Sequence, residues 1–258
     1  MSNASLVLRL CLSPTLIGAA SVVARRWGPA AGGWVAALPL TSGPVVLVLA
    51  LERGARFAAD ACVGIVLAIA ALAGYVLVYC LTSRRFGWPA CGALACAVYL
   101  ASLWPLGRVA ASLAAAFALA CATVLGTRRL LPRDPAPHAS GRAPAWDIPL
   151  RMAIAGALVW GLARISGVVG PRVSGLLAPF PVAVTIMSTF THRHEGAAAA
   201  REFLASLLTG LVSFAVFFLA VGALLPALGV ARAFVAATLG TLATHAAVWR
   251  LAGREAVA

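Results

Sequence analysis

Residues 33–44 read Gly33-Trp34-Val35-Ala36-Ala37-Leu38-Pro39-Leu40-Thr41-Ser42-Gly43-Pro44, an apolar run with a proline near its centre. Residues 175–185 read Gly175-Leu176-Leu177-Ala178-Pro179-Phe180-Pro181-Val182-Ala183-Val184-Thr185, with glycine and proline at the same spacing. The first glycines and the central prolines of the two stretches both lie 142 residues apart. This agreement predicts one backbone present in two copies.

Other residues keep the same spacing of 142 without a gap. The further matched pairs are Gly28–Gly170, Pro29–Pro171, Gly54–Gly196, Gly87–Gly229, Arg9–Arg151, Asp60–Glu202 and Arg108–Arg250. Glycine and proline fix unusual backbone geometry, so their coincidence favours duplication over the shared composition of an Ala- and Gly-rich chain.

The composition excludes an ordinary soluble domain. Hydrophobic residues make up 62% of the chain, charged residues 10%, and the mean hydropathy is +0.98. Soluble domains are about half apolar and a quarter charged. The net charge of +13 comes from arginines at the ends of apolar runs, which is a pattern of membrane topology and not of nucleic-acid binding.

Apolar runs long enough to cross a bilayer predict an all-α polytopic membrane protein. The nine predicted spans are residues 5–24, 33–51, 58–81, 87–105, 109–127, 148–166, 173–191, 200–223 and 231–249. The fifth span has no counterpart in the repeat, so the second copy starts on the opposite membrane face. This predicts a 4+1+4 inverted-topology repeat, an arrangement typical of secondary transporters.

Three parts of the chain follow from this division. Residues 1–106 form the first four-helix repeat, and residues 107–146 form a connecting span with a Pro-rich linker. Residues 147–258 form the second repeat. Thirteen arginines fall on the side of the C-terminus and seven on the other, which predicts a cytoplasmic C-terminus and an external N-terminus.

The prolines of the second and seventh spans predict helices that are kinked or broken near mid-membrane. Interrupted segments at matching positions of two halves point to a transporter's binding site. We therefore predict a substrate site at these breaks. Its candidate residues are Pro39, Thr41, Ser42, Pro181 and Thr185. Pro kinks used only for helix packing are the alternative.

The stretch Ser174-Gly175-Leu176-Leu177-Ala178-Pro179-Phe180-Pro181 resembles a segment of the GlpM-like family of small bacterial membrane proteins with about four helices. The resemblance covers about 35 residues of each half and is weaker in the first half, where Leu38 and Pro39 replace Phe180 and Pro181. It implies a four-helix repeat in a bacterial inner membrane, without a substrate or catalytic residues.

Charges inside spans are costly and usually pair. We predict two symmetry-related ion pairs, Arg9–Asp60 and Arg151–Glu202, with Asp147 a competing partner for Arg151 at helical spacing. Asp60 and Glu202 act either as proton-coupling carboxylates or as helix N-terminal acids. His245 together with Glu202 is a candidate proton gate.

No sequence motif of a hydrolase, kinase or metalloenzyme is present, so we expect neither an enzyme nor a cofactor or metal. The segment from Thr191 to Glu195 is interpreted as a solvated loop. The expected partners are the bilayer and a small-molecule substrate, without nucleic acid. A secondary transporter or permease is the preferred function, and an auxiliary or structural membrane subunit is the alternative.

Overall fold

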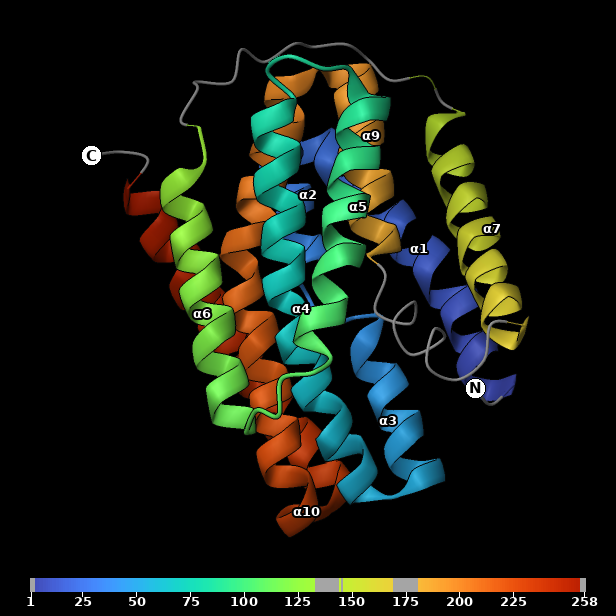
Figure 1. Ribbon diagram of the computed structural model, residues 1–258, viewed down its shortest axis with the longest axis vertical. Helices are drawn as coiled ribbons and strands as arrows, with labels where there is room; N and C mark the ends of the chain where they lie inside the picture. Colours follow the sequence, from blue (N-terminus) through green and yellow to red (C-terminus); the bar gives the residue numbers. More distant parts are fainter. Residues whose placement is uncertain (1–2, 133–143, 145, 169–180, 256–258) are drawn as a thin grey trace.

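The computed structural model describes residues 3–132, 144, 146–168 and 181–255, and side chains over 11–132, 144, 146–161 and 181–251. These residues are helical and joined by short turns, which confirms the all-α class (Figure 1). The helices are α1 (Asn3–Trp27), α2 (Pro29–Ala36), α3 (Ser42–Arg53), α4 (Ala55–Thr82), α5 (Trp88–Leu106), α6 (Leu113–Leu130), α7 (Asp147–Val168), α9 (Val182–Glu195) and α10 (Ala197–Glu255).

Glycines with positive φ separate several of these helices. Gly28 ends α1 before Pro29 opens α2, and Gly54 and Gly196 each join two helices. Gly229 bends α10 with φ of 73° and ψ of 174°, so this long helix has two arms, 197–228 and 230–255. Each of these turns therefore depends on a residue without a Cβ.

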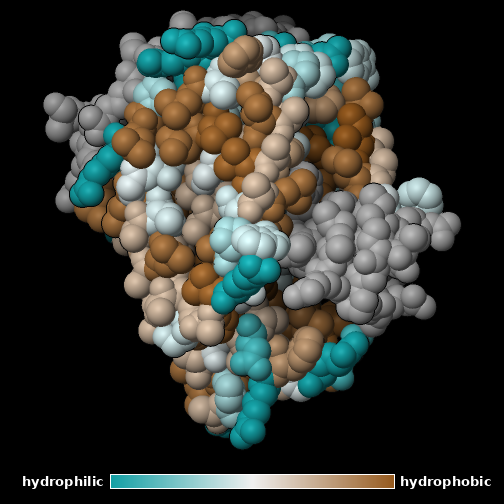
Figure 2. Space-filling view, viewed as in Figure 1, coloured by the Kyte–Doolittle hydropathy of each residue, from teal (hydrophilic) through white to brown (hydrophobic). Residues whose placement is uncertain are grey.

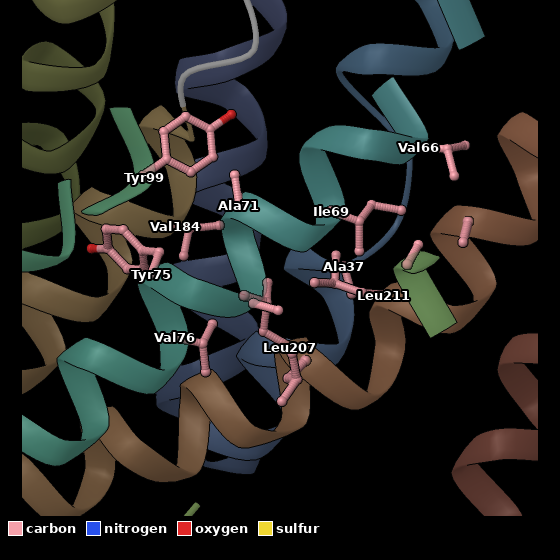
Figure 3. Packing of buried hydrophobic residues seen from close by; sticks show 14 of the residues in the cluster. Ala37, Val66, Ile69, Ala71, Tyr75, Val76, Tyr99, Val184, Leu207 and Leu211 are labelled. Carbon is pink, nitrogen blue, oxygen red and sulfur yellow. The ribbon is translucent and has the colours of Figure 1, made fainter. Parts of the chain in front are cut away.

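The centre of the bundle is formed by α4 and the first arm of α10, against which α2 also packs. Figure 3 shows Leu207 and Leu211 of α10 beside Ala37, and Ile69 and Val76 of α4 in the same cluster. Such small and aliphatic residues allow close helix packing in a membrane.

Helices α2 and α10 approach each other closely. A Cβ added to Gly33 would clash with the backbone carbonyl of Phe203 and lie 2.9 Å from the backbone nitrogen of Leu207. The two helix backbones therefore touch, and only glycine fits at this point.

The surface is compatible with an integral membrane protein. Four helices of the described part are long and apolar enough to span a bilayer: α4, α5, α6 and α10. Apolar side chains cover much of the middle of the visible face, and hydrophilic ones gather at its upper rim and toward its lower end (Figure 2). Exposed tryptophans near helix ends match the aromatic belts of membrane proteins. They are Trp27, Trp88, Trp104, Trp146 and Trp249.

Some predicted spans differ from the helices. The span at residues 33–51 is divided into α2 and α3, and the spans at 200–223 and 231–249 are the two arms of α10. In the predicted span at 173–191, residues 173–180 lie outside the described part, as does most of the predicted linker.

Candidate functional site

The interruption predicted at Pro39 is present. Helix α2 ends at Ala36 and α3 begins at Ser42. Within the break, the Gly43 N–H donates to the carbonyl of Pro39 at 2.8 Å, and Leu40 to Leu38 at 2.8 Å. Proline has no N–H and clashes with the preceding turn, which disfavours a continuous helix through this position.

The second predicted break is described from Pro181 onward. Pro181 precedes α9 with φ of −81° and ψ of 65°, and its carbonyl accepts the N–H of Thr185 at 2.9 Å. The residues before it, 169–180, lie outside the described part. Helix α9 therefore starts directly after the proline.

A small cavity of about 30 Å³ lies where α1, the α2–α3 break and the start of α9 meet. Thr41 lines it from the break, and Ala183 and Met187 line it from α9. The other lining residues are Leu16, Ile17, Ala20, Val35, Ala36, Leu38 and Leu40. A space of this size holds about one water molecule. Of the five residues predicted for the substrate site, Thr41 lines the cavity, whereas Pro39, Ser42, Pro181 and Thr185 are not among the lining residues.

Thr185 instead belongs to a polar contact between α9, α4 and α5. Its hydroxyl lies 3.9 Å from the Cys96 sulfur. One turn later, the Ser188 hydroxyl lies 3.1 Å from that of Tyr75, and the Tyr79 hydroxyl donates to the Ser188 carbonyl at 3.2 Å. These bonds satisfy buried hydroxyl groups and hold α9 against α4.

His192 ends this polar row. Its Nδ1 lies 3.2 Å from the Tyr79 hydroxyl. Burial lowers the pKa of His192, and the nearby Arg201 guanidinium lowers it further. His192 is therefore held toward the neutral imidazole, on the side of α9 that faces α4.

A buried charge centre lies on another side of α9, around Asp147 at the start of α7. The Asp147 side chain is fully buried and its Oδ2 lies 2.9 Å from Arg25 Nη2 of α1 and 2.9 Å from Arg151 Nε. Its Oδ1 lies 3.3 Å from His194 Nε2 of α9. The ends of three helices therefore meet on one carboxylate.

Helix dipoles favour this arrangement. Asp147 lies in the first turn of α7, while Arg25 and His194 lie in the last turns of α1 and α9. An acid is stabilised at a helix N-terminus and a base at a C-terminus. The Arg25 guanidinium also donates to the Pro144 carbonyl at 2.9 Å, next to the start of α7.

Met187 connects the charge centre with the cavity. Its sulfur accepts hydrogen bonds from the Ser21 hydroxyl at 3.1 Å and from Arg151 Nη1 at 3.6 Å. The same side chain lines the cavity. Met187 is therefore the one residue between the cavity and the Arg151 guanidinium, and a movement of its side chain would alter the contact with Arg151.

Glu195 adds a second carboxyl beside this centre. Burial raises the pKa of Glu195, and the charges of Asp147 and Glu202 act in the same direction, while Arg151 and Arg25 oppose them. The protonated form is thus favoured more strongly than for an exposed glutamate.

The predicted ion pair Arg151–Glu202 stays a prediction, while the competing partner Asp147 does pair with Arg151. Arg151 bonds Asp147, which lies one helical turn away on α7 and needs no approach of another helix. Glu202 is half-buried near the start of α10. Asp60 is exposed on α4, and the side chain of Arg9 lies outside the described part, so the pair Arg9–Asp60 stays a prediction.

His245 was predicted to lie with Glu202 in a proton gate. This role stays a prediction. The His245 Nδ1 lies 2.7 Å from the Ser213 hydroxyl on the first arm of α10. Its ring packs edge-on against Trp34 of α2 with centroids 4.9 Å apart. His245 therefore ties both arms of α10 to α2.

The interpretation of residues 191–195 as a solvated loop is wrong. These residues form the last turn of α9, and the His194 side chain is only 15% exposed. The sequence contained one signal of the charge centre, the spacing of four residues between Asp147 and Arg151. The spacing could not indicate Arg25 or His194, because they come from distant helices. No group of three His, Cys, Asp or Glu side chains in the described part of the chain could hold a metal ion.

No family model, curated protein or solved structure matches this chain. The resemblance to the GlpM-like family therefore stays a prediction, and most of the segment that carries it, residues 174–181, lies outside the described part.

Proposed function

We propose that this chain is a secondary transporter or permease for a small molecule, built as a 4+1+4 inverted repeat with nine membrane spans. The observation that carries the proposal is the cavity at the α2–α3 break. Thr41 from the α2–α3 break in the first half and Ala183, which follows Pro181 in the second half, both line it. Transporters bind their substrates between interrupted segments.

Helix boundaries support the repeat. Helix α3 ends at Arg53 and α9 at Glu195, 142 residues later, and α4 and α10 begin at Ala55 and Ala197, at the same spacing. The joining glycines, Gly54 and Gly196, both have φ of 92°.

Helix directions support the inversion. In Figure 1, α1 runs upward and its counterpart α7 runs downward, while α3 runs downward and α9 upward. The chain divides accordingly into residues 1–106, 107–146 and 147–258. The proposed location is a bacterial inner membrane, with an external N-terminus and a cytoplasmic C-terminus. The relation of each half to the GlpM-like family is part of the same proposal.

One observation favours the alternative of an auxiliary, non-transporting subunit. A cavity of about 30 Å³ admits a water molecule and no metabolite. A transporter with this structure must open the cavity during its cycle, whereas an auxiliary subunit need not. Neither proposal includes a catalytic step.

The test is proton and substrate flux in proteoliposomes, followed with an internal pH dye against a panel of metabolites and drugs. Ala183→Phe fills the cavity and should abolish any flux, whereas Ala236→Phe on an exposed face of α10 should leave it unchanged. Asp60→Asn and Glu202→Gln test the predicted coupling carboxylates. Flux that is equal in all variants and in empty vesicles would favour the auxiliary subunit.

A further inference from the structure

The charge centre of α1, α7 and α9 is balanced in one protonation state only. It contains two arginines, Arg25 and Arg151, and two carboxyls, Asp147 and Glu195. With both carboxyls ionised and His194 neutral, the positive and negative charges are equal. A proton taken up by His194 adds a positive charge to this buried site, where charge is costly.

Within the described residues, three side-chain atoms of this centre have no hydrogen-bond partner: Asp147 Oδ1, Arg151 Nε and His194 Nε2. The first and the third of them face each other. Asp147 Oδ1 and His194 Nε2 are both buried, lie 3.3 Å apart, and have no other hydrogen bond. Buried polar atoms are nearly always paired, so an unpaired facing pair indicates a place for a shared proton. Imidazole is the side chain that titrates nearest to neutral pH.

We propose that His194, held against Asp147, is the proton-binding site that controls how α9 is joined to α1 and α7. The inference rests on the proposed transport function for its biological role. This site is separate from the carboxylates predicted for proton coupling. Asp60 is exposed on α4, and Arg151, the partner predicted for Glu202, pairs with Asp147.

Charged groups from every neighbouring element act on this site. Arg25 of α1 and Arg151 of α7 oppose a positive charge on His194, while Asp147 and Glu195 favour it. The further charged neighbours are His192 and Arg193 on α9, and Arg201 and Glu202 on α10. Protonation adds a third cation beside Arg25 and Arg151 and allows His194 Nε2 to donate a charged hydrogen bond to Asp147 Oδ1, which strengthens the contact between α9 and α7.

The cavity and the proton site share Met187. Its sulfur contacts Arg151, which contacts Asp147, which contacts His194. Widening the cavity moves Met187 and thereby Arg151, so opening and proton binding are coupled. By linkage, each must change the equilibrium of the other by the same factor.

Trp146 provides the readout. Its ring packs edge-on against His194 with centroids 6.2 Å apart. Its emission is obtained by subtracting the signal of Trp146→Phe from that of the wild type in detergent. We expect this emission to show a one-proton transition as the pH is varied. His194→Gln should remove this transition. His192→Gln, two residues away on the side of α9 facing Tyr79, is the matched control and should retain it.

A second measurement does not depend on the folding of a variant. Histidine-labelled wild-type protein should show the His194 imidazole titrating by NMR at the same midpoint as Trp146. A wild-type protein without a Trp146 transition, or a transition that survives His194→Gln, would overturn the proposal.

Coupling to the cavity is tested with the same signal. Ala183→Phe should shift the Trp146 midpoint by about 0.7 pH unit or more, the fivefold effect at the lower end of allosteric couplings. Ala236→Phe should not shift it, and a midpoint unchanged in both variants would overturn the link through Met187. The Trp146 titration needs no substrate, so the two proposals can fail separately. A Trp146 transition in a protein that transports nothing would reject only the transport function. Transport by a protein without a Trp146 transition would reject only the proton site at His194.

Discussion

Gly54 and Gly196 adopt the same backbone conformation, with φ of 92° in both and ψ of 163° and 171°. Each separates a shorter helix from a long one, α3 from α4 and α9 from α10. This region of φ and ψ is almost restricted to glycine. A Cβ added at either position would have no atom within 4 Å, so steric crowding does not explain why glycine is present.

Gly54→Ala and Gly196→Ala should therefore each destabilise the protein by about 1–3 kcal/mol through backbone strain. The measurement is thermal unfolding in detergent. Gly126→Ala in α6 is the control: it also has open space, but it lies in a helix, where alanine should stabilise by up to about 1 kcal/mol. Unequal effects at the two turns would count against their equivalence in a repeat.

Gly33 leads to a second prediction, because its missing Cβ would clash with the backbone of α10. Gly33→Ala must push α2 away from Phe203, at a cost of about 1–3 kcal/mol or more. Gly64→Ala in α4 has nothing within 4 Å and should cost nothing. Melting temperatures of the two variants test this, and a harmless Gly33→Ala would show that α2 is not seated on α10.

The buried ion pairs give a third prediction. Asp147→Asn leaves Arg151 charged and 3% exposed without its carboxylate, which should cost about 3–5 kcal/mol. The double variant Asp147→Leu/Arg151→Met should recover most of that loss, because it removes both charges. Asp60→Asn, at an exposed position, should change the melting temperature little. If the double variant lost as much stability as Asp147→Asn, packing and not charge would be responsible for the loss.

Local signals in the sequence predicted much of the fold. Hydropathy indicated helices, and Pro39 and Gly54 marked ends that the structure also has, because the backbone constraints of proline and glycine act within a few residues. The predicted break became two separate helices, α2 and α3, since the close contact of Gly33 with α10 fixes α2 independently. That contact joins residues about 170 apart and has no local signature.

The candidate site was predicted less well for the same reason. Thr41 lines the cavity, while the Thr185 hydroxyl lies near the Cys96 sulfur and not at the cavity. The ion pair with Glu202 assumed contact between distant helices, whereas Asp147 was available one turn from Arg151. The role of His194 depends on the meeting of α7 and α9, which periodicity within one helix does not reveal.

Glu195 makes the stability of the protein depend on pH. Burial raises its pKa above the ordinary value of 4.5, so the folded protein binds this proton more tightly than the unfolded chain does. Its stabilising contribution is complete below about pH 4.5 and is lost as the pH rises through the raised pKa. Glu195→Gln, which keeps the uncharged shape at all pH values, should match wild type in acid and exceed it in melting temperature at neutral pH. Glu52→Gln, at an exposed position near the end of α3, should follow the wild-type curve throughout. If Glu195→Gln were instead less stable than wild type at neutral pH, the ionised carboxylate would be holding Arg25 and Arg151 in place, and attraction to these arginines would outweigh burial.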